Sequence, residues 1–418
     1  MKKLTQSLLA LSVASAMFTT VGVANAESFA ITNAKVHTST EQGVIDNAVI
    51  IVNDGVITNV AATDKLTSFE VDSVIDAQGK IVTPGLISSM NILGLVEVSA
   101  VADSSDARDK KADITFDASY GYNPKASSIA YTRKGGITRN VVTPAGGEDI
   151  FAGQTFVADL SGDWDSITQA NNAVVVELGA NHEGSRVIYT QQLVNELEKA
   201  HKALTKDSKD KEADEPEAAD KILNQILQDK KPLVVAVERA SDILIVLKLK
   251  QQYDLNVVLV GAADAVLVAD EIAKAEVPVI IDAMRNLPEN FDSLHNHLTN
   301  AAKLDAAGVK VILSSLGDSH NVYSLRYSAG TAVANGMDYN AALEAMTVNV
   351  AETFNINSGQ IAKGKVADIV IWSGDPFEYS SQVLTMFING EQQSTESRHD
   401  KLRQRYTTPS DLPRAYTK

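Results

Sequence analysis

The sequence predicts an α/β fold, in which a (β/α)8 TIM barrel is accompanied by a small β-sandwich formed by the N- and C-terminal flanks. In the centre of the chain, apolar strands alternate with helical patterns, which is typical of parallel strands covered on both faces. Short strands separated by turn residues precede and follow this centre. Because each flank is too small to fold separately, we expect the two flanks to pair with each other.

The chain begins with the pattern of a secretory signal. Residues 2–3 are lysines, residues 8–18 are apolar, and residues 24–26 read Ala-Asn-Ala, a small-x-small cleavage site. We therefore predict a signal peptide over residues 1–26, cleavage after Ala26 and export to a bacterial periplasm. An uncleaved N-terminal anchor is the alternative.

Composition excludes several kinds of partner and site. Cysteine is absent, which excludes disulfides, thiolate ligands and a cysteine nucleophile. The formal net charge of −16 argues against nucleic acid and anionic membranes as partners. After the signal, no segment is long and apolar enough to cross a membrane, so the mature chain is expected to have no span.

The first flank, residues 27–82, is predicted to form the N-terminal portion of the sandwich. Residues 29–36 alternate between apolar and polar side chains, as a half-buried strand does. Residues 48–52 and 56–60 are joined by Asn53-Asp54-Gly55, which predicts a β-hairpin. Residues 74–82 supply two more short strands around a glycine turn.

The centre, residues 83–355, carries eight candidate barrel strands. The segment 156–160 has an alternative interpretation, an excursion before the next barrel strand. A charged stretch at 199–221 is interpreted as a solvated helix extension or loop, with a partner-docking insertion as the alternative. Helical patterns include 241–253, 265–275 and 339–351. The predicted strands are 86–92, 137–143, 156–160, 173–178, 233–237, 257–261, 277–281 and 309–313.

The second flank, residues 356–395, is predicted to form the C-terminal portion of the sandwich. The stretch 359–372 ends in an alternating strand, and residues 383–388 form another before Asn389-Gly390. Residues 396–418 follow as a C-terminal tail.

Four segments resemble the metal-dependent amidohydrolase superfamily, particularly its imidazolonepropionase-like branch. The resemblance covers most of the mature chain and implies the barrel fold and hydrolysis of C–N bonds in linear or cyclic amides. The segments are Asp76–Ile87 with Thr83-Pro84-Gly85-Leu86-Ile87, Gly135-Gly136-Ile137-Thr138, Gly317-Asp318-Ser319-His320, and Gly364-Lys365-Val366-Ala367-Asp368 with its continuation to Pro376.

The resemblance also implies a metal centre that activates water, and this sequence lacks several of its ligands. The family places two histidines on the first strand, where this chain has Met90 and Ile92. The fifth and sixth strands lack the family's histidines too, and only the eighth-strand aspartate, Asp318, is retained. Since a thioether and an alkyl group are poor zinc ligands, we predict a degenerate site. A weakly bound divalent metal such as zinc and no metal at all both remain open.

Active sites of such barrels lie at the carboxyl ends of the strands. There, Glu238, Asp318 and His320 could perform general acid–base chemistry, or they could form a buried ion-pair network with arginines. His295 and His297, two residues apart in a predicted helical stretch, are interpreted as surface or core residues. The candidates for substrate binding are Glu97, His182, Arg239 and Arg285.

Two functions from different classes follow. The first is an exported hydrolase of C–N bonds with an atypical or weakened metal site. The second is a catalytically inactive protein that binds a small amide- or peptide-like ligand, or that supports an active paralogue. A homo-oligomer, or a hetero-oligomer with a related amidohydrolase, is the corresponding assembly.

Overall fold

The computed structural model describes residues 28–66, 68–179, 185–205 and 217–408. The predicted signal peptide and its cleavage site lie outside the described residues, and so does His182. Within the described ranges, no helix combines the length and the apolar character needed to cross a bilayer.

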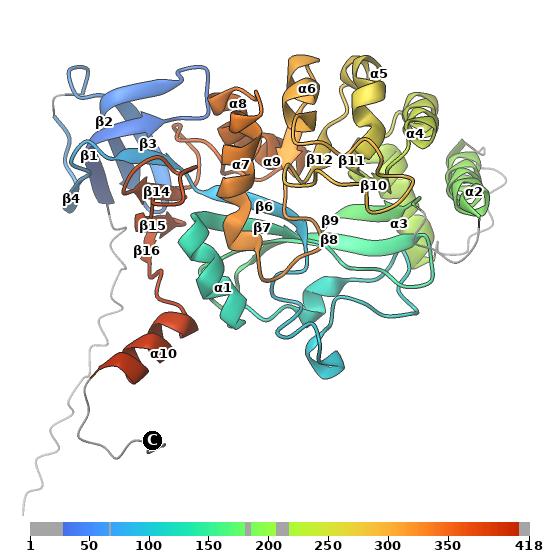
Figure 1. The fold of residues 1–418 in the computed structure, drawn as a ribbon, viewed down its shortest axis with the longest axis horizontal. Coiled ribbons are helices and arrows are strands. Elements are labelled where there is room, and N and C mark those ends of the chain that lie inside the picture. Colours follow the sequence, from blue (N-terminus) through green and yellow to red (C-terminus); the bar gives the residue numbers. More distant parts are fainter. Residues whose placement is uncertain (1–27, 67, 180–184, 206–216, 409–418) are drawn as a thin grey trace, which may run out of the picture.

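The centre of the chain forms an eight-stranded sheet whose strand order in space follows the sequence (Figure 1). All eight strands overlap with predicted ones, and the predicted fold class is confirmed. The strands are β6 (Leu86–Asn91), β7 (Ile137–Val142), β8 (Phe151–Asp159), β9 (Ile167–Glu177), β10 (Leu233–Val237), β11 (Val257–Gly261), β12 (Val279–Ile281) and β13 (Val311–Leu313).

The third strand, β8, differs from the expected parallel arrangement. It runs antiparallel to β7 and to β9, whereas the remaining neighbours in the sheet are parallel. A parallel connection needs a crossover of about a dozen residues or more, usually with a helix. Residues 143–150 and 160–166 contain no helix. The chain therefore turns back at each of these connections, and the segment 156–160 belongs to the sheet with its direction reversed.

The sheet curls until its two edge strands, β6 and β13, nearly meet. Backbone of residues 345–346 lies between them: Leu313 N donates to Ala345 O at 3.0 Å, and Ile87 N donates to Met346 O at 2.8 Å. Nearer the carboxyl ends, Gly317 N donates to Met90 O at 2.9 Å. These bonds satisfy edge groups that an open sheet would expose.

The barrel is filled with side chains. Alternate residues of the strands, such as Ile87, Val141, Val234 and Ile312, meet in a buried apolar cluster. Met90 belongs to this cluster. Burial of this kind makes the barrel a packed core and leaves room for ligands only at its ends.

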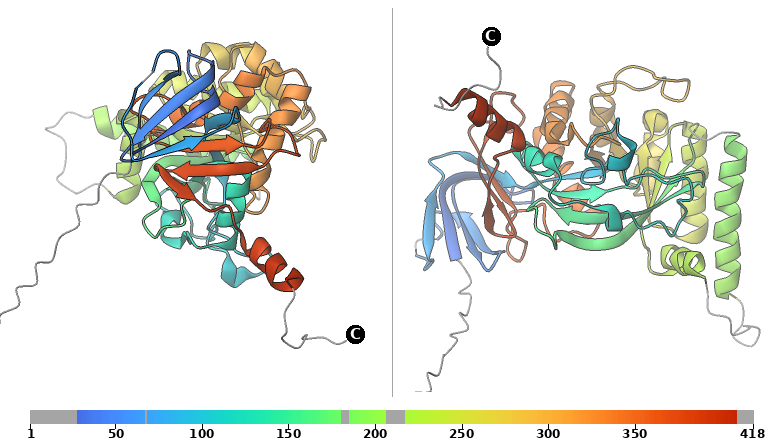
Figure 2. Two further views of the ribbon diagram at one scale, coloured as in Figure 1. Left: turned by 90° about the vertical axis from the view of Figure 1, so that its left-hand side faces the viewer. Right: turned by 90° about the horizontal axis from the view of Figure 1, so that it is seen from below.

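Helices cover much of the outside of the barrel (Figure 2), whereas the outer faces of β7 and β8 pack against the segment that follows β6. The predicted helix 241–253 is confirmed as α4, and the charged stretch 199–221 divides between the end of α2, the start of α3 and residues 206–216, which are not described. The helices are α1 (Ser127–Thr132), α2 (Arg186–Thr205), α3 (Ala218–Gln228), α4 (Ala240–Tyr253), α5 (Ala269–Lys274), α6 (Asn300–Ala306), α7 (Leu325–Ala334), α8 (Tyr339–Glu344) and α9 (Val348–Thr353).

The two flanks pair, as predicted, into one eight-stranded flank sheet. β5 and β14 join them in an antiparallel pair with Pro84 opposite Ile369. The sheet curls over its own apolar core, so that Val56 in β3 bridges Val366 just before β14. The strands are β1 (Ser28–His37), β2 (Val44–Asn53), β3 (Val56–Ala62), β4 (Ser73–Asp76), β5 (Ile81–Pro84), β14 (Ile369–Trp372), β15 (Val383–Ile388) and β16 (Glu391–Gln393).

The C-terminal tail contains one helix, α10 (Arg398–Thr407). It begins with a capping box, in which Ser397 and Asp400 each bind the other's backbone N–H. No residue of α10 is buried. Lys134 Nζ, 2.6 Å from Asp400 Oδ2, attaches the start of the helix to the barrel.

Candidate active site at the barrel mouth

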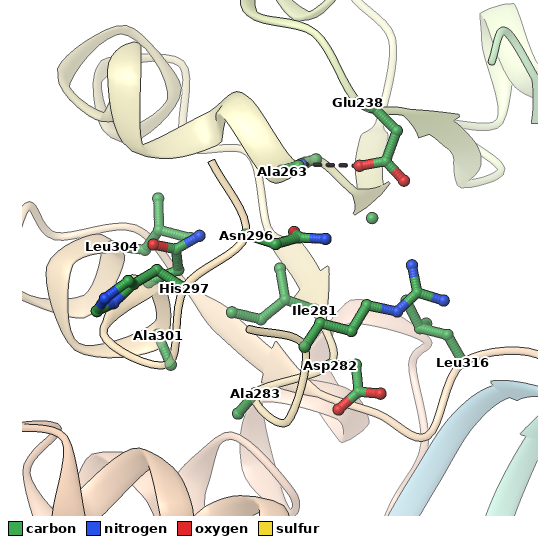
Figure 3. A pocket seen from close by; sticks show the side chains of 14 residues that line it. Glu238, Ala263, Ile281, Asp282, Ala283, Asn296, His297, Ala301, Leu304 and Leu316 are labelled. Atoms are coloured by element: carbon green, nitrogen blue, oxygen red, sulfur yellow. Dashed lines mark hydrogen bonds between the residues drawn. The ribbon is translucent and has the colours of Figure 1, made fainter. Parts of the chain in front are cut away.

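The carboxyl ends of β9 to β12 surround two neighbouring hollows. The smaller, about 20 Å³, has room for about one water molecule. The larger, about 190 Å³, opens toward Glu177 at the end of β9 and Glu289, Asn290 and Asp292 in the loop after β12. Glu238 and Arg285 line both hollows, which makes them the central residues of the site (Figure 3).

Glu238 follows β10 directly and is held from the next strand along the barrel. Its Oε2 accepts a hydrogen bond from Ala263 N at 2.9 Å. Burial raises the pKa of Glu238, although the Ala263 N–H and the charge of Arg285 act in the opposite direction. A Cβ atom at Gly261 would lie 2.6 Å from Glu238 Oε1, and the φ of +81° at Gly261 also favours glycine, so this glycine suits the observed position of the carboxyl group.

Asp282 follows β12 and also lines the smaller hollow. Its Oδ1 accepts a hydrogen bond from Met284 N at 2.9 Å. Burial raises the pKa of Asp282, again against the opposing effects of a backbone N–H and of Arg285. The mouth therefore holds two carboxyl groups whose ionisation is made costly by burial (Figure 3).

We expect the isosteric amides Glu238→Gln and Asp282→Asn to stabilise the protein at neutral pH. A carboxyl group with a raised pKa binds more protons in the folded state, so the free energy of unfolding falls as pH rises from its ordinary pKa to the raised one. Each amide should therefore raise Tm by about 2 °C at pH 8, and the gain should vanish at pH 4. Thermal unfolding at both pH values measures this, and an equal gain at both would contradict it.

Asp318 and His320 lie outside both hollows. Asp318 Oδ1 accepts from His320 N at 2.6 Å, and Asp318 Oδ2 accepts from Asn321 Nδ2 at 2.7 Å. Burial alone would raise the pKa of Asp318, but these donors outweigh it and lower the pKa. His320 is exposed, with Nε2 3.3 Å from Ser99 Oγ. The structure thus does not bring these two residues into the hollows that Glu238 lines.

Three of the candidates for substrate binding lie among the described residues, and of these only Arg285 lines the hollows. Arg239 forms two 2.9 Å bonds to Asp242 at the start of α4. Glu97 accepts from Asn123 Nδ2 at 3.1 Å. Arg239 and Glu97 therefore hold neighbouring parts of the protein itself in place.

The positions of the expected metal-binding histidines are unsuited to a cation. Met90 is 5% exposed and packs in the apolar interior of the barrel. Between Met90 and Ile92, Asn91 is buried and exchanges hydrogen bonds of 2.8 and 2.9 Å with Asn140. Within the described part of the chain, no three His, Asp or Glu side chains form a group that could hold a metal ion. The described residues around these positions do not fit a catalytic divalent cation.

Apart from Arg285 and the end of β12, sequence reasoning missed the residues of the loop between β12 and α6 that line the hollows. His295 and His297 were expected in a helical stretch, which is wrong: both lie in the loop before α6. His297 lines the smaller hollow, and His295 Nδ1 lies 2.6 Å from Asp264 Oδ1. Pro288 and the several asparagines of this loop are turn-forming residues that could have indicated its structure.

Comparison with known proteins supports the fold and the family. Residues 229–393, from the end of α3 to β16, match the model of the amidohydrolase family. The amidohydrolase resemblance is confirmed. The matched region contains Glu238, Asp282 and Asp318, whereas Met90 and Ile92 lie outside it. The search of curated proteins found no match.

Solved structures share this fold. An amidohydrolase from Thermotoga maritima MSB8 has a TM-score of 0.79 at 23% identity, over 87% of this chain and 99% of that one. The β-aspartyl dipeptidase of Fervidobacterium islandicum AW-1 has a TM-score of 0.52 at 14% identity, over 88% and 98%. A molinate hydrolase has a TM-score of 0.55 at 15% identity, over 94% and 98%. At these identities the likeness concerns architecture, so function has to be argued from the site.

Proposed function

We propose that this protein is an exported hydrolase of C–N bonds in small amide- or peptide-like substrates, with an atypical site centred on Glu238. The observation that carries the proposal is a carboxyl group with a raised pKa, at the end of a barrel strand, lining two hollows together with Arg285. The amidohydrolase match over residues 229–393 supports the reaction class. The Fervidobacterium relative, a β-aspartyl dipeptidase seen with a β-Asp-Leu dipeptide, supports the substrate class.

The geometry suits general base catalysis. A raised pKa makes the Glu238 carboxylate a stronger base than an exposed glutamate. Glu238 would take a proton from a water molecule in the smaller hollow, the water oxygen would attack the carbonyl carbon, and the proton would pass to the departing nitrogen. The guanidinium group of Arg285 lines the same hollows and offers N–H donors to the oxygen that becomes negative.

The proposal predicts a specific loss in Glu238→Gln. With a panel of dipeptides and N-acyl amino acids as substrates, kcat/KM should fall about a hundredfold because the base is removed. In the unaltered protein, kcat/KM should rise with pH through the raised pKa of Glu238, and this rise should be absent from the variant. Glu271→Gln, at an exposed position on α5, is the matched control. It should leave kcat/KM and its rise with pH unchanged. Equal activity in the two variants would refute the role of Glu238.

A second function, binding without turnover, is favoured by the packing of Met90 at an expected metal position. Calorimetry with the same panel separates the two functions: saturable heat without product supports a binding protein. Copurification with a second amidohydrolase would support a subunit that assists an active paralogue. The lysines, apolar run and Ala-Asn-Ala of the N-terminus support export to the periplasm in either case.

A further inference from the structure

A second cavity lies away from the barrel mouth, where α1, α7, α10 and the loop between β14 and β15 meet. It is an open groove of about 690 Å³, within the range of about 300–1,000 Å³ that is typical of small-molecule sites. None of the residues that line the two mouth hollows lines this groove. Its aromatic and cationic lining includes Tyr131, Tyr323, Tyr327, Tyr379, Arg326 and Arg403.

Arg326 places a buried positive charge in the wall of the groove. It is 3% exposed, and its Nη1 donates to the carbonyl oxygens of Pro376 and Glu378 at 2.6 and 2.8 Å. Its Nη2 donates to the Tyr327 hydroxyl and to Ser381 O, and its Nε is buried without a hydrogen-bond partner. All the acceptors are neutral. A buried cation whose hydrogen-bond acceptors are all neutral has no counter-charge within the protein, which favours an anion in the adjacent groove.

Two stacked tyrosine rings form one wall of the groove. Tyr327 and Tyr379 stack with ring centroids 4.1 Å apart and an interplanar angle of 13°. Tyr379 is 73% exposed, so much of its surface remains available for a further contact. The Arg326 guanidinium lies 4.2 Å from the Tyr327 ring. Stacked rings beside a guanidinium favour a ligand with a planar group.

Counted together with Arg326, the charges that line the groove carry a small positive excess, whereas the chain as a whole is acidic. Lys134 and Arg403 both face Asp400, at 2.6 and 3.8 Å. Lys134, Arg326 and Arg403 outnumber the carboxyl groups of Glu396 and Asp400 among the lining residues. In a chain of net charge −16, this local excess of positive charge is a specific feature of the groove.

We propose that this groove is a second binding site, which takes a small organic anion carrying a planar ring. The anionic group faces Arg326 and Arg403, and the ring stacks on Tyr379. The site is independent of the hydrolytic function proposed for the mouth, and its test does not depend on activity.

Tryptophan fluorescence gives a local readout. The chain has two tryptophans, Trp164 and Trp372, and the Trp372 ring lies 5.6 Å from the Arg326 guanidinium. Trp164 is 79% exposed, so Trp164→Phe should change the stability of the fold little, and it leaves Trp372 as the sole fluorescent reporter. In this background, phenyl phosphate should change the Trp372 emission saturably. Benzylamine, with the same ring and the opposite charge, should not, and inorganic phosphate should bind at least about tenfold more weakly because it lacks the ring.

Matched variants assign the site. Tyr379→Ala should weaken phenyl phosphate binding about tenfold, and Arg403→Gln about threefold. Tyr406→Ala and Arg405→Gln, on α10 outside the groove, are the controls and should leave it unchanged. The proposal would be overturned if the controls lost as much affinity as the groove variants, or if benzylamine bound as tightly as phenyl phosphate. It would also be overturned if phenyl phosphate produced neither a Trp372 response nor heat in calorimetry. If inorganic phosphate bound as tightly as phenyl phosphate, the ring would contribute nothing, and the proposed stacking on Tyr379 would be overturned.

Discussion

Replacing Arg139 by methionine is expected to lower the free energy of unfolding by about 3–5 kcal/mol. Arg139, on β7, is 4% exposed, and its Nε lies 2.5 Å from Asp368 Oδ2. Asp368 is 1% exposed and also accepts from Ser358 Oγ at 2.7 Å and from Asn389 N at 2.9 Å. Without the guanidinium, a buried carboxylate would keep its neutral partners and lose its counter-charge.

The Arg139–Asp368 pair also joins the barrel to the flank sheet, so its loss should affect both. Trp372, in β14, donates from Nε1 to Thr83 Oγ1 at 2.9 Å and reports on this junction. Urea unfolding followed by Trp372 fluorescence in the Trp164→Phe background measures the change. The control is Lys310→Met, which breaks a half-exposed pair with Glu352 and should cost less than about 1 kcal/mol. Similar losses in the two variants would contradict the prediction.

The same junction shows what the sequence could not provide. Asp368 was recognised within the Gly364-Lys365-Val366-Ala367-Asp368 segment, but its partner was not. Arg139 stands inside an apolar strand, and nothing near it in sequence indicates an acidic residue 229 positions away. Long-range pairs of this kind become visible only when the flanks are placed against the barrel.

The positions of the barrel strands were predictable, but the direction of one of them was not. Runs of Val, Ile and Leu mark buried strands because both faces of the sheet are covered, and this property is independent of direction. The reversal of β8 depends on the lengths of its two connections, residues 143–150 and 160–166. The predicted strands leave residues 144–155 and 161–172 as connections, which are about long enough for crossovers. The connections prove short only because β8 and β9 extend into these residues.

The candidate site was predictable in part for a related reason. Glu238 follows a strand directly, and Arg285 follows the next strand but one, so the barrel brings them to one edge. Asp318 and His320 also follow a strand, but the Asp318 carboxylate binds N–H groups of its own turn. Local hydrogen bonds of this kind decide where a loop side chain points, and strand position alone does not reveal them.

Introducing the family's histidine pair, Met90→His with Ile92→His, is expected to destabilise the fold without creating a zinc site. Met90 lies in the apolar interior, so an imidazole there would lose water without gaining an assured partner, at a cost of about 2–3 kcal/mol. Zinc requires at least three protein ligands as a rule, and the described residues offer no such group around this position.

Zinc content and thermal unfolding of the double variant test this expectation together. The control pair, Met90→Leu with Ile92→Leu, conserves side-chain volume and should cost less than about 1.5 kcal/mol per site. The double histidine variant should bind no more zinc than the unaltered protein after the same exposure, and it should unfold at a lower temperature than the control. Stoichiometric zinc that disappears on adding Asp318→Asn would show the opposite: that the mouth can still assemble around a metal and that Asp318 leaves its turn to bind it. The physical obstacle is the packing around Met90, because a histidine at this position must displace apolar neighbours before it can meet a cation.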